Sequence, residues 1–375
     1  MQIDSIKLQS YRNYDSLSLS TGKGITVFYG ENGAGKTNLL EAIHLCGLGR
    51  SHRSAQDREL VSHDNSRGRV VVSASLRDGR HDIEINLDKG EKRCKQIKVQ
   101  GKPISRLGEL MGHVRCVMFS PEDLLMIREG PSLRRRFMDM QLSQLRPAYF
   151  YALQKYNSAL NQRNALLREG LVKKREVPDA LLDVWDEQLA AEAETLSRYR
   201  RWFSDKIVKE AAQNYRYISG REGEAFVVRV KGVLAEKENP RDAMREGLLR
   251  LRPEDKRRAA THFGPHRDDI VMILADKDIK AFGSQGQIRT AALALKLSQL
   301  RFMEEDEGEK PVLLLDDVMS ELDPRRRELL LERIQEVQAF VTCTDLMDLS
   351  GAKATQRIHV LRENGRAVVQ SEMQG

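Results

Sequence analysis

The eight residues GENGAGKT at positions 30–37 decide the fold of this chain. They match the pattern GxxxxGK[ST], and they stand between a predicted strand, ITVFY, and a helical pattern over 38–48, as a phosphate-binding loop does. Because glycine has no side chain, backbone N–H groups can close around phosphate oxygens, and the N-terminus of the next helix adds partial positive charge. An ordinary glycine-rich turn is the alternative, and the strand–loop–helix context argues against it.

The loop residues have expected roles in binding ATP. Lys36 would bring a positive charge to the β- and γ-phosphates, and Thr37 would offer its hydroxyl to Mg²⁺. ATP and Mg²⁺ are therefore the expected cofactors. The residues that we expect at the nucleotide are Gly30, Glu31, Asn32, Gly33, Ala34, Gly35, Lys36, Thr37 and Asn38.

The segment VLLLDD at 312–317 supplies the acidic partner that such a loop needs. Its apolar run is typical of a buried parallel strand, and two carboxylates follow at the carboxyl end of that strand. We expect Asp316 to share the Mg²⁺ site with Thr37, and Asp317 to polarise the attacking water. Lys36, Asp316 and Asp317 form the expected catalytic set. The pattern is weak by itself, since many buried strands end in acidic residues, but the loop at 30–37 strengthens it.

A second candidate anion site lies at FGSQGQ, positions 282–287, just before a long predicted helix. A serine hydroxyl, a glycine backbone and a helix N-terminus together favour a phosphate. One nucleotide-binding head does not need two phosphate cradles, so this one would serve a nucleotide held by a second copy of the chain. A plain helix start, and a plain N-cap at Asp323, are the alternatives. The residues expected to act on the second copy's nucleotide are Ser284, Gly286, Gln287 and Asp323.

Sequence patterns divide the chain into three parts. Residues 1–130 contain alternating strands and a hairpin signal at Asp78-Gly79, and they are expected to form the N-terminal part of an ATPase head with a β-lobe. Residues 131–218 have helical periodicity broken at REVPD, which predicts two helices of similar length in a hairpin arm. Residues 219–375 would complete the head. The long insertion explains why the loop at 30–37 and the acidic strand lie so far apart in the sequence.

Composition excludes several classes of protein. With 40% hydrophobic and 31% charged residues, the chain can bury a core and is not a disordered protein. It has no long apolar stretch for a membrane span and no secretory h-region, and its four isolated cysteines form no zinc or disulfide pattern. We therefore expect a cytoplasmic protein. The net charge of +7 comes from the first 230 residues, which makes a polyanion such as DNA a plausible partner.

The order of the motifs resembles the ABC/SMC class of ATPase heads, and the wider sequence resembles the RecF family. The similarity spans about residues 3–363, and the short arm also fits, because SMC proteins carry much longer coiled coils. The resemblance implies an α/β fold: an ABC/SMC-type P-loop ATPase head with an antiparallel β-lobe and an inserted helical-hairpin arm. The segments that carry it are SYRNY (10–14), GRSHR (49–53), FSPEDL (119–124), GPSLRRRFMD (130–139) and FGPHRDD (263–269).

The resemblance also implies a function in DNA replication and recombinational repair. ATP would join two heads into a homodimer that clamps single-stranded or gapped DNA, and weak hydrolysis would act as a release switch. Cooperation with RecR and RecO in loading RecA, and support of SOS induction, are implied in the same way. The resemblance further places Arg12 and Asn13 at the nucleotide, for which a plain exposed loop is the alternative. Candidate DNA contacts are Arg50, Arg53, Arg134, Arg135 and Arg136, for which an exposed, solvated surface is the alternative.

Two departures from related heads predict weak hydrolysis. Asp317 stands where transporter-type heads have glutamate, and the segment Val341-Thr342-Cys343-Thr344 stands where many heads have a histidine. Two other classes of function remain as alternatives. One is an ABC-type subunit that acts as a scaffold without DNA contact, against which the basic first 230 residues argue. The other is a motor or nuclease, but the sequence has neither a second motor core nor a further cluster of carboxylates.

Overall fold

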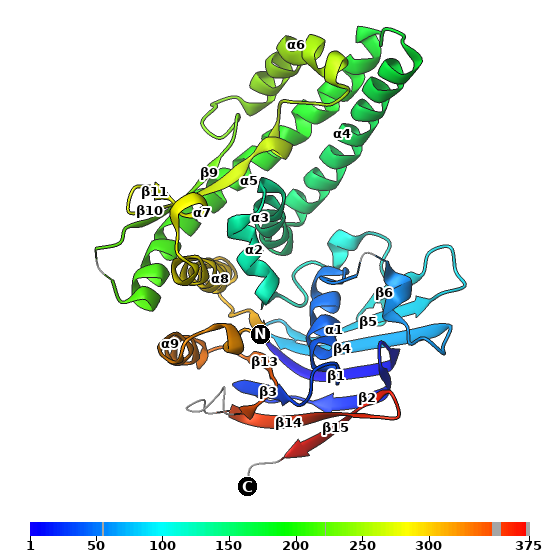
Figure 1. Cartoon of the computed structure of the whole chain (residues 1–375). Helices are drawn as coiled ribbons and strands as arrows, with labels where there is room; N and C mark the ends of the chain where they lie inside the picture. Colours follow the sequence, from blue (N-terminus) through cyan, green and yellow to red (C-terminus); the bar gives the residue numbers. More distant parts are fainter. Residues whose placement is uncertain (55, 222, 347–353, 373–375) are drawn as a thin grey trace. The chain divides into compact units, whose positions relative to one another are not determined.

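The computed structural model describes residues 1–54, 56–221, 223–346 and 354–372 (Figure 1). By its internal contacts the chain forms two compact units. Unit 1 comprises Met1–Leu124, Tyr217–Gly220 and Arg289–Gly375, and unit 2 comprises Leu125–Arg216 and Arg221–Ile288. Unit 2 therefore includes residues 221–288, which we expected in the C-terminal part of the head.

Unit 1 contains a mixed six-stranded sheet with the strand order β15-β14-β3-β13-β12-β8. All neighbouring strands are parallel except β15, which pairs antiparallel with β14. Strand β12 lies between two parallel neighbours, which is why VLLLD is an unbroken apolar run up to its last residue. The bounds are β3 Ile25–Tyr29, β8 Cys116–Phe119, β12 Val312–Asp316, β13 Ala339–Cys343, β14 Ala354–Glu363 and β15 Arg366–Glu372.

A second six-stranded sheet of unit 1 is antiparallel and has the order β2-β1-β4-β5-β6-β7. It is the β-lobe that the alternating patterns predicted. Strands β4 and β5 form a hairpin in which Leu76 pairs with Gly79, so the chain reverses at Arg77-Asp78, one residue before the predicted turn at Asp78-Gly79. The bounds are β1 Gln2–Tyr11, β2 Tyr14–Ser20, β4 Arg67–Leu76, β5 Gly79–Asp88, β6 Lys95–Val99 and β7 Lys102–Pro103.

Helices α1, α8 and α9 begin at or next to the segments that the sequence predicted to bind phosphate. Helix α1, Lys36–Leu48, starts inside the phosphate-binding loop and is almost entirely buried. It ends at Gly49, whose φ of 66° is the left-handed conformation in which glycine commonly closes a helix. Helix α9, Pro324–Ile334, starts with proline at its first position and Asp323 as N-cap. Helix α8, Gln285–Glu307, begins in unit 2 and continues into unit 1.

The arm of unit 2 has three long helices where we expected two. Helices α3, Pro131–Leu145, and α4, Pro147–Lys173, are separated at Pro147, because proline has no N–H and starts a helix far more readily than it continues one. Helix α5, Asp179–Ser219, has 41 residues and is much longer than expected. Figure 1 shows α4 and α5 running side by side, as the hydrogen bond from Arg163 to Asp186 requires.

The segment after the arm contains elements that the sequence patterns missed. Helix α6, Pro240–Arg258, carries Arg252, which forms ion pairs with Asp183 and Asp186 of α5. Because the face of α6 that contacts α5 is partly ionic, the sequence of α6 shows little apolar periodicity. The packing of α6 on α5 explains why residues 221–288 belong with the arm. The remaining elements of unit 2 are a sheet β11-β10-β9, with bounds Phe226–Lys231 for β9, Asp269–Leu274 for β10 and Lys277–Asp278 for β11, and the short helices α2, Leu125–Arg128, and α7, Ile279–Phe282.

Candidate nucleotide-binding site

The loop at 30–37 holds a conformation that depends on glycine. Gly30 and Gly35 have φ of 142° and 123°, which side chains disfavour. A Cβ on Gly30 would lie 2.2 Å from the carbonyl oxygen of Val360, and one on Gly35 would lie 2.8 Å from Oδ1 of Asn13. The Nζ of Lys36 donates to the carbonyl oxygens of Gly30 (2.6 Å) and Glu31 (2.8 Å) and so holds the loop closed.

The loop presents open hydrogen-bond donors, which is the test of its fit to a phosphate. Within the described residues, the backbone N–H groups of Gly35, Lys36 and Thr37 have no protein acceptor. These are the first N–H groups of α1, which no carbonyl of the helix can reach. Together with the positive end of the helix dipole, they make a site for an anionic oxygen. The residues present therefore fit the phosphates of ATP.

Oxygen ligands for a cation meet between the loop and the end of β12. The Oγ1 of Thr37 donates to Oδ1 of Asp316 at 2.7 Å, although 279 residues separate the two in sequence. The same carboxylate oxygen accepts a hydrogen bond from the Oγ1 of Thr342 at 2.9 Å. Because Mg²⁺ prefers oxygen ligands and usually takes only one or two carboxylates from the protein, this set of donors fits Mg²⁺.

Asp317 has an unusual backbone conformation for an aspartate that follows a strand. Its φ is 52°, in the left-handed region, and its N–H donates to Oγ1 of Thr342 at 2.9 Å. Strained residues of this kind cluster at functional sites. Burial lowers the pKa of Lys36, while the negative charges of Asp317 and Asp316 oppose that shift. Lys36 and both aspartates of the expected catalytic set are thus close enough to interact.

The structure places Arg12 and Asn13 differently with respect to the loop. Asn13 donates from Nδ2 to the carbonyl oxygen of Ala34 and accepts a hydrogen bond from Asn38, both at 2.8 Å. Arg12 instead pairs through two nitrogens with the fully buried carboxylate of Glu41 on α1. Asn13 therefore belongs to the loop directly, whereas Arg12 reaches it through Glu41.

Glu41 and Thr342 are site residues whose contacts sequence reasoning missed. Burial alone would raise the pKa of Glu41, but hydrogen bonds from Arg12 and Ser51 outweigh burial and lower it. The available signal for Glu41 in the sequence was an acidic residue within an otherwise apolar helical pattern. For Thr342 the sequence indicated only a segment, 341–344, after a buried strand, whereas Thr342 lies inside β13 and is 1% exposed. Its hydroxyl proves to connect Asp316 with the backbone of Asp317.

The second candidate anion site lies in unit 2 and is ordered by its own side chains. The Oγ of Ser284 accepts from the backbone N–H of Gln287 at 3.3 Å, and the side-chain oxygen of Gln287 accepts from the N–H of Ser284 at 2.9 Å. This reciprocal pair is a capping box at the start of α8. Gly286 lies between them, and Ser284 is exposed. Asp323, in unit 1, accepts from the N–H of Arg326 at 3.0 Å as the N-cap of α9.

The candidate DNA-contact arginines fall into two groups. Arg134 is 5% exposed, pairs through two nitrogens with Asp269, and donates to two backbone carbonyls. Arg135 is half-buried and donates to the carbonyl oxygen of Asp268 at 2.8 Å. The structure therefore uses Arg134 and Arg135 to hold the loop before β10. The candidates that remain on the surface are Arg50, Arg53 and Arg136.

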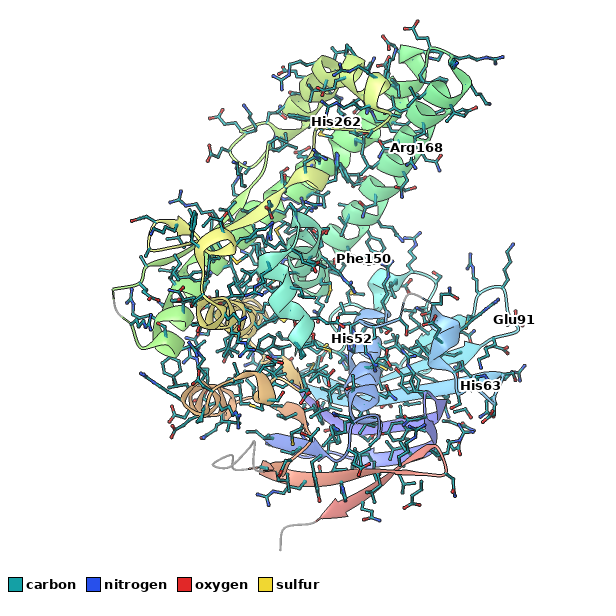
Figure 2. All side chains as sticks on the ribbon, viewed as in Figure 1. His52, His63, Glu91, Phe150, Arg168 and His262 are labelled. Atoms are coloured by element: carbon teal, nitrogen blue, oxygen red, sulfur yellow. The ribbon has the colours of Figure 1, made fainter. Side chains whose placement is uncertain are left out.

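The histidines and aspartates of the segment 262–269 form hydrogen bonds and ion pairs with other residues of the chain. The Nδ1 of His262, which Figure 2 labels, lies 2.9 Å from Oδ1 of Asp255. His266 contacts the hydroxyl of Tyr156 and the carbonyl oxygen of Thr261. In the ranges that the structure describes, no three His, Cys, Asp or Glu residues gather as metal ligands.

Comparison with known proteins agrees with this fold. A family model described as the RecF/RecN/SMC N terminal domain matches residues 2–366. A solved SMC head bound to the C-winged helix domain of ScpA has a TM-score of 0.59 at 15% identity and covers 100% of this chain and 98% of that chain, a likeness in fold alone. The fold and the site thus define a P-loop ATPase head of the SMC type.

Relatives of higher identity narrow the class to one family. "DNA replication and repair protein RecF" of Acetivibrio thermocellus is 41% identical over 370 residues, which cover 98% of this chain and 99% of the relative. Its namesake in Symbiobacterium thermophilum is 41% identical over 93% of each chain. The chain belongs to the RecF family.

The solved structures of RecF share the whole fold. One, the recombination mediator protein RecF with ATP in the RecFOR pathway, has a TM-score of 0.88 and 34% identity, and covers 99% of this chain and 97% of that chain.

Across the described parts of the present chain, no helix has the length and apolar character that crossing a membrane demands.

Proposed function

We propose that this protein is an ATP-dependent DNA-binding switch of replication and recombinational repair. ATP, with Mg²⁺, would bind at the loop of unit 1 and join two copies of the chain. The joined copies would hold single-stranded or gapped DNA, and slow hydrolysis would release it. The observation that carries the proposal is the set of open N–H groups at the start of α1 beside the oxygens of Thr37 and Asp316.

The residues of the loop have distinct tasks in this proposal. The N–H groups of Gly35, Lys36 and Thr37 bind phosphate oxygens, and Lys36 adds a charge that its present carbonyl partners do not neutralise. Thr37 and Asp316 would hold Mg²⁺, which when bound neutralises phosphate charge. Asp317, fixed through Thr342, would orient and polarise the water. Aspartate is one methylene shorter than glutamate, which is consistent with slow turnover.

The partners follow from the relatives and from the charge of the chain. A relative of known structure is a recombination mediator in the RecFOR pathway, which supports RecO and RecR as partners. RecA, as the protein whose loading is assisted, is proposed from the resemblance to the RecF family. Support of SOS induction belongs to the same proposal. The exposed arginines Arg50, Arg53 and Arg136 are the proposed DNA contacts. The ATPase itself would be weak and serve as a timer.

A salt titration of DNA binding, with and without ATP, tests the proposal. We expect affinity for gapped DNA to rise with ATP and to fall steeply with salt, because phosphate contacts release counterions. Sedimentation with ATP and with ADP should show a dimer with ATP only. DNA affinity that is absent at low salt would point to the scaffold function instead. A dimer that forms equally with ADP would contradict the switch.

A further inference from the structure

Phe282 is an exposed aromatic side chain at the end of α7. It is 72% exposed, the most exposed aromatic side chain among the residues that the structure describes. Most phenylalanines of a folded protein are buried, because each buries a large apolar area. An isolated exposed residue needs no explanation, so its surroundings decide whether it has a task.

The backbone beneath Phe282 is held firmly. Ile279, at the other end of the same helical turn, is 1% exposed and anchors it, and Asp278 caps it by accepting from the N–H of Lys280 at 2.8 Å. The N–H of Gly283 donates to the carbonyl oxygen of Ile279 at 2.9 Å. A Cβ on Gly283 would lie 2.5 Å from that same oxygen, so the turn is also tightly packed. The phenyl ring therefore projects from a fixed base, which lowers the entropy cost of docking it.

The position of Phe282 in the chain indicates which surface it meets. It stands two residues before Ser284, whose capping box with Gln287 is the site proposed to contact the nucleotide of a second copy. The surrounding segment, 275–283, has two lysines and two aspartates, so its formal charge is zero. A DNA-binding surface would instead carry an excess of positive charge. A protein surface next to the shared nucleotide fits an exposed, neutral, rigid aromatic residue better.

We propose that Phe282 is an apolar anchor of the ATP-dependent dimer and docks on the second copy of this chain beside the shared nucleotide. The inference rests on the proposed function, because it requires that two copies pair through the segment at 284–287. In such a pairing the two copies are related by a two-fold axis, so each dimer contains the contact twice. Aromatic residues in this situation are frequent hot spots of interfaces.

The test measures the dimer dissociation constant with ATP by sedimentation, for the full chain and its variants. Phe282→Ala should raise that constant about 30-fold for each of the two contacts that it removes, or roughly 1,000-fold in all, the loss expected for an aromatic hot spot that occurs twice. Phe282→Leu should recover part of it, since leucine keeps apolar area. ATP binding by the monomer should be unchanged, because Phe282 is not part of the loop at 30–37. Leu249→Ala is the matched control: Leu249, on α6 of the same unit, is 63% exposed and should leave dimerisation unchanged.

The outcomes separate this inference from the proposed function. A wild-type chain that forms no dimer with ATP would overturn both. If Ser284→Arg blocks the dimer but Phe282→Ala does not, the two copies pair through the segment at 284–287 and the proposed role of Phe282 is wrong. If Phe282→Ala weakens DNA binding while the dimer is unaffected, the ring contacts a base and the inference is again wrong.

Discussion

The nucleotide-binding loop of unit 1 and the arm of unit 2 both concentrate charged and polar groups, but they use them in opposite ways. In the arm, Arg163 is fully buried and pairs with Asp186 and Asp255, which the chain itself supplies. In the loop, the first N–H groups of α1 meet no acceptor in the described chain. Groups paired within the chain stabilise the fold, and groups left open are available to a ligand.

The same distinction applies within one run of arginines. Arg134 faces Asp269 and is buried, whereas Arg136, two positions later on α3, is exposed. Neighbours in sequence thus have different tasks because the helix turns them toward different surroundings. The predictions below test whether the charges of the arm act on stability and those of the loop on binding.

The largest effect is expected from Asp255→Ala in the arm. Asp255 is fully buried and pairs with Arg163, so its loss leaves a buried guanidinium short of a partner and should cost about 3–5 kcal/mol. Urea unfolding followed by helical circular dichroism measures it. Glu169→Ala removes an exposed ion pair with Lys173 and should not shift the midpoint. If both variants shift the unfolding midpoint equally, buried ion pairs of the arm do not contribute more to stability than exposed ones.

Lys36→Ala should act on binding. Removing a charged donor from a mostly buried site should weaken ATP binding by about 100-fold, roughly 3 kcal/mol, and so prevent ATP-dependent dimerisation. Calorimetric titration with ATP measures the affinity. Lys23→Ala, an exposed lysine of the same unit, should bind ATP normally. Dimers that persist in Lys36→Ala at equal ATP would contradict the mechanism.

His266 should make the stability of unit 2 depend on pH. Burial lowers its pKa to about 4, and the nearby charges of Arg267, Arg135 and Arg200 act in the same direction. The unfolded chain takes up this proton below pH 6.5 and the folded chain only near pH 4, so the stabilising contribution is complete above pH 6.5 and is lost as the pH falls toward 4. Between pH 7 and 5 the loss should be about 2 kcal/mol.

Urea unfolding at several pH values of wild type and His266→Gln checks this dependence. The variant should have a flatter profile between pH 7 and 5. His63→Gln serves as a control, because His63 projects into solvent from unit 1 (Figure 2). A wild-type profile no steeper than that of His266→Gln would show that the buried ring does not resist protonation.

The smallest effect is expected from Arg136→Ala. Arg136 is exposed, so the change should leave the unfolding midpoint in place and lower the salt slope of DNA binding by about 1, the loss of one phosphate contact. Arg134→Ala is the informative partner, since it should reduce stability through the lost pair with Asp269. If Arg136→Ala leaves the salt slope unchanged, DNA does not contact this face of α3.

Local sequence patterns were enough to predict the class of fold and to indicate where a nucleotide would bind. The loop at 30–37, the strand ending in Asp316 and the turn at Asp78-Gly79 are local patterns, because glycine conformations, apolar runs and helix starts depend on neighbours in the chain. They predicted the mixed sheet and the antiparallel lobe, which the structure confirms, while the role of the loop in nucleotide binding stays a prediction. The third arm helix was missed because its only signal was one proline, Pro147.

Which charged side chains pair with each other depends on contacts between residues that are far apart in the chain. The acidic partners of Arg134 and Arg163 lie 135 and up to 92 residues away, and no local pattern indicates such distances. Two other contacts likewise depend on how separate strands and helices pack: the hydrogen bond from Thr37 to Asp316 and the ion pair of Arg12 with Glu41. Helix α6 was missed for a related reason: Met244 and Leu248 give its buried face only a short apolar pattern, and Arg252 on that face becomes a packing residue only when α5 supplies the opposite charges.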